Sequence, residues 1–63
     1  MKRTELIRYI EAHGCYLKRE GGKHTLYRNP TKNKTSAIPR HSEIKDLLAI
    51  KICKDLEIPA IKK

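Results

Sequence analysis

The sequence predicts an α+β domain in which a helix at each end of the chain flanks three antiparallel strands. Three observations predict this class: apolar residues recur at helical spacing near both ends, polar and apolar residues alternate between them, and glycine or proline marks the turns. The chain has 63 residues, and a chain of this size buries only about 60% of its unfolded surface. We therefore expect residues 1–63 to form a single domain with a thin core.

The first helix is predicted over residues 3–13. We expect the hydroxyl of Thr4 to cap its first turn, and Glu5 to interact favourably with the positive end of the helix dipole. Gly14 is expected to end the helix in the left-handed conformation. The apolar residues at helical spacing are Leu6, Ile7 and Ile10.

The last helix is predicted over about residues 46–56. Pro59 stops any further helix, and residues 62–63 are expected to form a frayed tail. The inward-facing stripe is expected to contain either Leu48 or Ala49, followed by Ile52, Cys53 and Leu56.

The first two strands are predicted to form a hairpin. Residues 15–19 alternate in polarity, which places Cys15 and Leu17 on the buried face. Residues 20–23 contain two adjacent glycines and form the turn, and residues 24–28 form the second strand. A need for positive φ in this tight turn is one sufficient explanation for Gly21 and Gly22.

The third strand is predicted over residues 35–39, with Ile38 in the core. Residues 29–34 form the preceding loop because they include a proline, two asparagines and no apolar residue. Residues 40–43 connect the third strand to the last helix. The order α-β-β-β-α allows both helices to cover one face of a three-stranded antiparallel sheet, which is the outline of a double-stranded-RNA-binding-domain fold.

The charge of the chain favours a polyanionic partner. Fifteen Lys and Arg residues outnumber seven Asp and Glu residues, which gives a net charge of +8 and a pI near 9.8. Nucleic acid is the polyanion that best suits a small basic domain. A solvated surface or an acidic protein partner also suits this charge.

The two cysteines, Cys15 and Cys53, have neither metal-ligand nor redox-motif spacing. Each lies among apolar residues, so we expect two buried free thiols, which suit a reducing cytoplasm. No run of apolar residues is long enough for a signal peptide or a membrane span. The sequence thus predicts a cytoplasmic protein that does not enter the membrane.

His24 is the strongest candidate for a catalytic residue. It directly follows the glycine-containing turn, so its ring is expected to project toward solvent from the start of a strand. An imidazole gives or takes a proton near neutral pH, and a histidine on a basic surface suits a reaction at a phosphodiester. The basic residues near it in the sequence are Lys18, Arg19, Lys23 and Arg28.

Residues 21–30 and 35–41 resemble the HicA family of toxins, and the likeness extends over nearly the whole chain. The family pattern is a glycine, often a Ser or Thr, the catalytic histidine, and an aromatic residue three positions later; Gly22, His24 and Tyr27 match it. The Ile-Pro-x-His step at residues 38–41 and the closing helical segment at residues 52–56 also match. Lys23 departs from the pattern, because many members have Ser or Thr at its position.

HicA toxins are small ribonucleases of toxin–antitoxin systems with the double-stranded-RNA-binding-domain fold. The resemblance therefore implies a type II toxin, an mRNA interferase that cleaves RNA with His24 as its catalytic residue. It also implies a HicB-like antitoxin as the protein partner. The residues expected to contact the RNA substrate are Gly22, Lys23, Tyr27, Lys18, Arg19, Arg28 and Arg40.

The chemistry of RNA makes a metal or other cofactor unnecessary, because the 2′-hydroxyl beside the scissile phosphate is an internal nucleophile. The sequence also lacks the clustered carboxylates of a two-metal nuclease. The second proton-transfer partner of His24 is left open between water, Lys23 and His41. For His41 the alternative to proton transfer is a structural hydrogen bond. For Tyr27 the alternative to contact with RNA is a partly buried position in the sheet.

Two other functions fit the same sequence. One is a non-catalytic RNA-binding module that uses the same basic face, which would bind RNA in a salt-dependent way without cleaving it. The other is an adaptor that binds an acidic protein and has no affinity for RNA.

Overall fold

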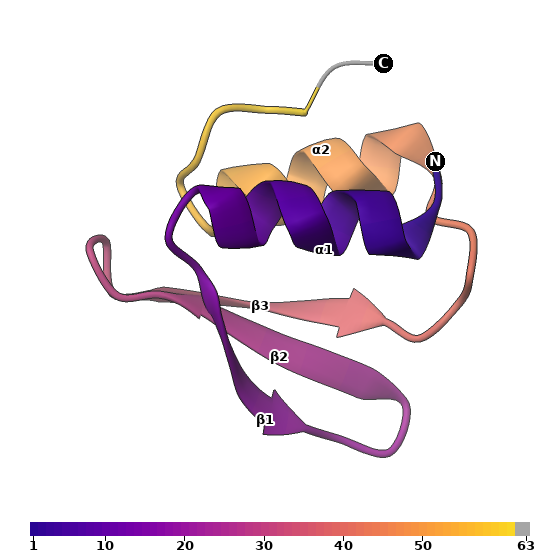
Figure 1. Ribbon diagram of the computed structural model, residues 1–63, viewed down its shortest axis with the longest axis horizontal. Coiled ribbons are helices and arrows are strands. Elements are labelled where there is room, and N and C mark those ends of the chain that lie inside the picture. Colours follow the sequence, from indigo (N-terminus) through magenta and orange to yellow (C-terminus); the bar gives the residue numbers. More distant parts are fainter. Residues whose placement is uncertain (62–63) are drawn as a thin grey trace.

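The computed structural model describes residues 1–61 and confirms the predicted order of elements. The elements are α1 (Arg3–Ala12), β1 (Tyr16–Glu20), β2 (His24–Asn29), β3 (Lys34–Pro39) and α2 (Asp46–Asp55). Both helices lie over one face of the sheet, and the other face is uncovered (Figure 1). This arrangement is compatible with the predicted double-stranded-RNA-binding-domain outline. The tail predicted at residues 62–63 lies outside the described residues.

The strands form one antiparallel sheet in the order β1-β2-β3. Side chains alternate between the two faces along a strand, and along β2 the residues Thr25, Tyr27 and Asn29 are buried whereas His24 is exposed. In the register between β2 and β3, His24 lies opposite Pro39. His24 therefore lies at the start of β2 on the uncovered face, next to the point where the chain leaves β3.

The prediction that Leu17 is buried is wrong, because its side chain is 46% exposed. Leu17 lies opposite Tyr27 and so shares the helix-covered face, but β1 is an edge strand and all its residues are exposed. The pairing then becomes irregular between Leu17 and Arg19, which leaves Lys18 at a bulge. An alternating pattern indicates a face of the sheet, but it does not indicate whether a helix covers that part of the face.

The hydrophobic core lies between the sheet and the two helices. Ile38 is completely buried, as predicted, and Ala49 rather than Leu48 belongs to the inward stripe of α2. Cys15 and Cys53 are buried free thiols, and burial raises the pKa of both. The buried hydrophobic residues are Leu6, Ile10, Cys15, Tyr27, Ile38, Ile44, Ala49, Ile52, Cys53 and Leu56.

The sequence predicted that Thr4 caps the first turn of α1, and this prediction is wrong. The N-cap residue is Lys2, whose backbone is extended and whose side chain makes no capping hydrogen bond. The backbone N–H of Arg3 instead donates to the carbonyl of Ser42 at 2.9 Å, so the segment before α2 satisfies a donor that a cap would otherwise bind. At the other end, Gly14 has the predicted left-handed conformation, with φ of +90°.

The end of β2 is fixed to the end of α2 by Asn29, which the sequence had placed in the following loop. Asn29 is 4% exposed, and its Nδ2 donates to the carbonyl of Leu56 at 2.7 Å. Its Oδ1 accepts a hydrogen bond from the N–H of Thr31 at 3.2 Å. Both the amide nitrogen and the amide oxygen of this buried side chain therefore have a hydrogen-bond partner.

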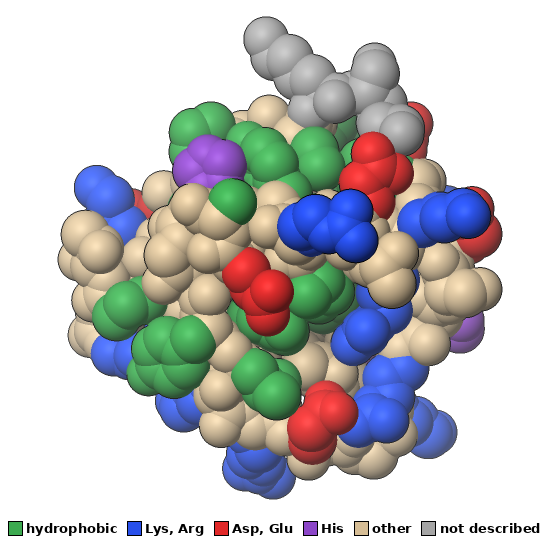
Figure 2. Space-filling model, viewed as in Figure 1, with side chains coloured by type: hydrophobic (Ala, Val, Ile, Leu, Met, Phe, Trp, Pro, Cys, Tyr) green, Lys and Arg blue, Asp and Glu red, His purple; other side chains and the backbone are tan. Residues whose placement is uncertain are grey.

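The surface carries the positive charge predicted from the composition. On the face shown in Figure 2, Lys and Arg side chains lie mainly toward the right-hand and lower margins. In the same view, Figure 1 places the β1–β2 turn and the segment between β3 and α2 on the right. Neither helix within residues 1–61 has the length and apolar content needed to span a membrane.

Candidate functional site

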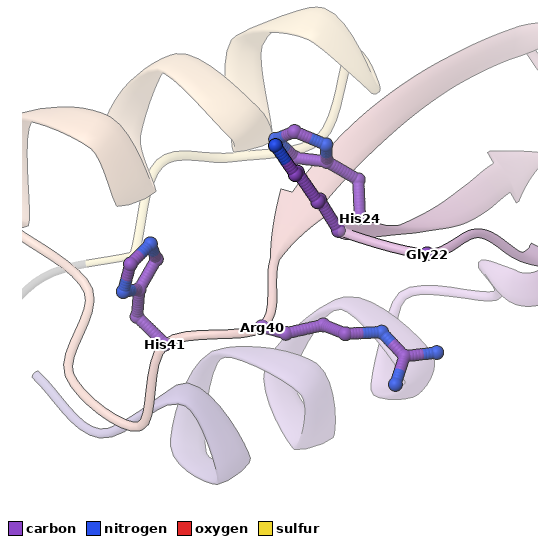
Figure 3. A pocket seen from close by; sticks show the side chains of 5 residues that line it. Gly22, His24, Arg40 and His41 are labelled. Atoms are coloured by element: carbon purple, nitrogen blue, oxygen red, sulfur yellow. The ribbon is translucent and has the colours of Figure 1, made fainter.

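A surface pocket of about 360 Å³ forms where the β1–β2 turn meets the segment that follows β3. Its lining residues are Gly22, Lys23, His24, Arg40 and His41 (Figure 3). The register of the sheet explains this meeting, because His24 lies opposite Pro39 and the next two residues are Arg40 and His41. The sheet thus brings together residues that lie far apart in the sequence.

Of the three histidines, His13 contacts another side chain, whereas His24 and His41 have free rings among the residues that the structure describes. The Nδ1 of His13 lies 3.0 Å from the carbonyl oxygen of Tyr9, and its ring also packs against the Tyr9 ring. The rings of His24 and His41 are exposed, and neither makes a hydrogen bond or ion pair with any of residues 1–61. The structural hydrogen bond expected for His41 is therefore absent from the described part of the chain. Two unpartnered imidazoles line one pocket.

The turn before His24 depends on a close approach at Gly21. The N–H of Gly21 donates to the carbonyl of His24 at 2.8 Å. A Cβ atom at Gly21 would lie 2.8 Å from the same carbonyl oxygen, whereas one at Gly22 would meet nothing within 4 Å. Neither glycine has a positive φ. The explanation by left-handed backbone is therefore wrong for this turn, and lack of space is the reason for Gly21.

Replacing Gly21 by alanine is expected to destabilise the protein, whereas the same change at Gly22 is expected to have little effect. The added methyl group of Gly21→Ala collides with backbone that a rotamer change cannot move, and such overpacking costs about 1–3 kcal/mol. Urea unfolding of both variants measures the difference. Equal stability of the two variants would show that the turn adapts without cost.

A chain of hydrogen bonds beneath the pocket joins α1 to the ends of all three strands. Arg3 donates through Nε to the Pro39 carbonyl at 2.8 Å and through Nη2 to Thr25 Oγ1 at 2.9 Å. Thr25 donates to Glu20 at 2.7 Å, and Glu20 pairs with Arg40 at 3.0 Å. Because Thr25 is next to His24 and Pro39 is next to Arg40, these contacts position the pocket. Sequence reasoning missed Arg3, Thr25 and Glu20, which carry no local motif.

The segment that carries Arg40 and His41 is also held by the start of the chain. Lys2 forms an antiparallel bridge with Glu43, and the N–H of Ile44 donates to the Met1 carbonyl at 2.8 Å. The side chain of Ile44 is buried in the core, with 2% of its surface exposed. The backbone beside His41 is therefore fixed although the ring itself is exposed.

Only some of the predicted substrate-binding residues lie at the pocket. Gly22, Lys23 and Arg40 line it, as does His24. The remaining basic residues lie elsewhere: Lys18 at the bulge in β1, Arg19 opposite Leu26, and Arg28 near the far end of β2, where it bonds Asn33. The ammonium group of Lys23 makes no ion pair or hydrogen bond within residues 1–61.

Tyr27, which was expected to contact the RNA substrate, is buried instead. Its side chain is 5% exposed on the helix-covered face, and its hydroxyl donates to Glu11 Oε2 at 2.9 Å. Burial, together with this hydrogen bond to a carboxylate, raises the pKa of Tyr27 to about 12. Tyr27 thus belongs to the core, which corrects the substrate-binding role expected from the sequence.

The raised pKa of Tyr27 predicts a loss of stability at alkaline pH. The folded state favours the neutral phenol, so this stabilisation is present below pH 10 and is lost as pH rises from 10 toward 12. The rise of the Tyr27 pKa from 10 to about 12 corresponds to at most about 3 kcal/mol. Urea unfolding of the wild type and Tyr27→Phe at several pH values measures the effect. The variant should lose less stability over this range, and parallel curves would contradict the assignment.

The fold and the pocket together define a small basic protein of α-β-β-β-α order with two histidines in one surface site. A family model described as the HicA toxin of bacterial toxin–antitoxin systems matches residues 3–58, which include all five helices and strands. The chain therefore belongs to the HicA toxin family, as its sequence motifs had suggested. Searches of curated proteins and of solved structures gave no match.

Proposed function

We propose that this HicA-family toxin is an mRNA interferase, an endoribonuclease that uses His24 as an acid–base residue. The observation that carries the proposal is the pocket itself, which the unpartnered ring of His24 lines together with two basic residues, Lys23 and Arg40. An exposed imidazole beside cationic groups suits proton transfer at a phosphodiester. The substrate is single-stranded or loosely structured mRNA.

The proposed reaction is an internal transesterification of RNA. The 2′-oxygen attacks the adjacent phosphorus, the bond from phosphorus to the 5′-oxygen breaks, and the products are a 2′,3′-cyclic phosphate and a 5′-hydroxyl. One proton leaves the 2′-hydroxyl and another is delivered to the 5′-oxygen. His24 carries out one of these transfers, which is worth about 10²- to 10⁴-fold in rate.

Lys23 and Arg40 are proposed to stabilise the negative charge that develops on the phosphate oxygens. Lys23 stands where many family members have Ser or Thr, so this chain replaces a hydroxyl with a cation. Because the ammonium group has no partner within residues 1–61, it is available to a phosphate. Arg40 is already paired with Glu20 through Nη2, and the remaining N–H groups of its guanidinium are available for phosphate contact.

The proposed partner is a HicB-like antitoxin that covers the His24 pocket. Membership of a toxin family supports a cognate antitoxin, and the net charge of +8 supports an acidic binding surface on it. Opposite charges accelerate association, and salt screens them. Addition of the antitoxin is expected to protect RNA from the toxin.

The test is incubation of purified wild-type protein with one defined single-stranded RNA and with DNA of the same sequence, both in the presence of a chelator. We expect fragments from the RNA and none from the DNA, because DNA lacks the 2′-hydroxyl. RNA that is bound in a salt-dependent way but stays intact would contradict the proposal and favour a non-catalytic RNA-binding module. Cleavage of the RNA and of the DNA at similar rates would also contradict the proposal.

A further inference from the structure

We propose that His41 is the second proton-transfer residue of the pocket and works with His24 on the same phosphodiester. This inference rests on the proposed ribonuclease function. The transesterification needs one group that accepts a proton from the 2′-oxygen and another that donates a proton to the 5′-oxygen. A second side chain that exchanges a proton near neutral pH would carry out the transfer that His24 does not.

His41 and His24 reach the pocket from separate segments of the chain. His24 begins β2, whereas His41 lies in the segment after β3, and both line the same pocket. In Figure 3 the two rings extend in the same general direction from their separate segments, and the side chain of Arg40 extends away from His41. A phosphate in this pocket would thus meet two imidazoles, one from the start of β2 and one from the segment after β3.

His41 is also free to act. Its ring makes no hydrogen bond or ion pair within residues 1–61, and it is exposed. Its backbone is nevertheless held, because the Ser42 carbonyl accepts the N–H of Arg3 at 2.9 Å and Ile44 is buried. A fixed backbone with an unpartnered ring suits a residue that must meet a substrate in a defined place.

The two other cationic side chains of the pocket are poorer candidates. An arginine guanidinium stays charged in proteins and does not transfer its proton, and Nη2 of Arg40 is already paired with Glu20 at 3.0 Å. A lysine ammonium releases its proton much less readily near neutral pH than an imidazolium does. Lys23 and Arg40 therefore fit charge stabilisation, and His41 fits proton transfer.

The two histidines complete the reaction without any further reactant. One imidazole, in its neutral form, accepts the proton of the 2′-hydroxyl as the 2′-oxygen bonds to phosphorus. The other, in its protonated form, donates its proton to the 5′-oxygen as that oxygen leaves phosphorus. Exchange with water then returns both rings to their starting protonation states, so protons and electrons balance.

The test uses an RNA whose cleaved linkage has first been mapped with the wild-type protein. The same RNA is then made with sulfur in place of the 5′-oxygen at that linkage, because a thiolate leaves without being protonated. Single-turnover rates on both RNAs are compared for the wild type, His24→Ala and His41→Ala. His13→Ala is the matched control, since His13 is an exposed histidine that does not line the pocket. Thermal unfolding checks that each variant is folded.

On the ordinary linkage, His24→Ala and His41→Ala are each expected to be about 10²- to 10⁴-fold slower than the wild type. On the sulfur linkage, one of the two variants is expected to return to within about tenfold of the wild type, and the other is not. The rescued variant is the one that lacks the proton donor.

Wild-type rates for His41→Ala on the ordinary linkage would overturn the role of His41 while leaving the ribonuclease function intact. A slow His41→Ala protein would also overturn it if the sulfur linkage rescued neither variant. A wild-type protein that does not cleave the ordinary linkage would instead contradict the ribonuclease function itself, and this inference with it.

Discussion

The His24→Ala protein is expected to fold like the wild type and to cleave RNA at least about 100-fold more slowly, because it lacks one proton-transfer group. The ring of His24 is exposed and has no partner within residues 1–61. Its removal should therefore change the free energy of unfolding by no more than about 0.5 kcal/mol. Single-turnover cleavage of one RNA, measured beside urea unfolding, separates loss of chemistry from loss of fold.

The control for this prediction is His13→Ala. His13 is also exposed, but it contacts Tyr9 at the end of α1 and does not line the pocket. Its replacement should leave the cleavage rate unchanged. Equal losses in both variants would point to a general effect of removing a histidine, and unchanged cleavage by His24→Ala would remove His24 from the mechanism.

The second large effect is expected for Asn29→Asp, which should destabilise the protein by about 1–3 kcal/mol or more. The side chain is 4% exposed, and its amide nitrogen donates to the Leu56 carbonyl at 2.7 Å. Aspartate has nearly the same shape, but it places an oxygen against that carbonyl and leaves a buried acceptor without a donor. The loss should be measured by urea unfolding at neutral pH, where the new carboxylate is charged.

Asn33→Asp provides the matched comparison, because it makes the same chemical change at an exposed position in the β2–β3 loop. Asn33 accepts a hydrogen bond from Arg28 through its side-chain oxygen, and aspartate keeps this acceptor. Its stability should stay within about 0.5 kcal/mol of the wild type. If both variants lost the same small amount, the contact between Asn29 and Leu56 would not stabilise the fold.

The order of the elements could be predicted from the sequence because each element has a local signal. Gly14 marks the end of α1, and the apolar stripe of α2 leads into Leu56. The errors concern contacts between distant segments. Thr4 has the right chemistry for a cap, but pairing of the chain start with Ser42 begins the helix earlier. Leu17 has the right alternation, but it lies on an edge strand.

The candidate site was predictable in part for the same reason. Lys23 and His24 lie together in a turn with its own signal, whereas the approach of His41 depends on the register between β2 and β3. The error at Tyr27 could have been avoided. Residues an odd number apart on a strand point to opposite faces, so an exposed His24 places Tyr27, three positions later, on the buried face.

The most direct test of the central claim is cleavage at one mapped linkage after the 2′-hydroxyl beside it has been replaced by hydrogen. The reaction proposed for this pocket uses the 2′-hydroxyl of RNA as the nucleophile, and a histidine accepts its proton. Wild-type protein should then leave the altered linkage intact in the presence of a chelator, while it still cleaves the unmodified RNA. Cleavage of the altered linkage at the original rate would show that the 2′-hydroxyl is not the nucleophile.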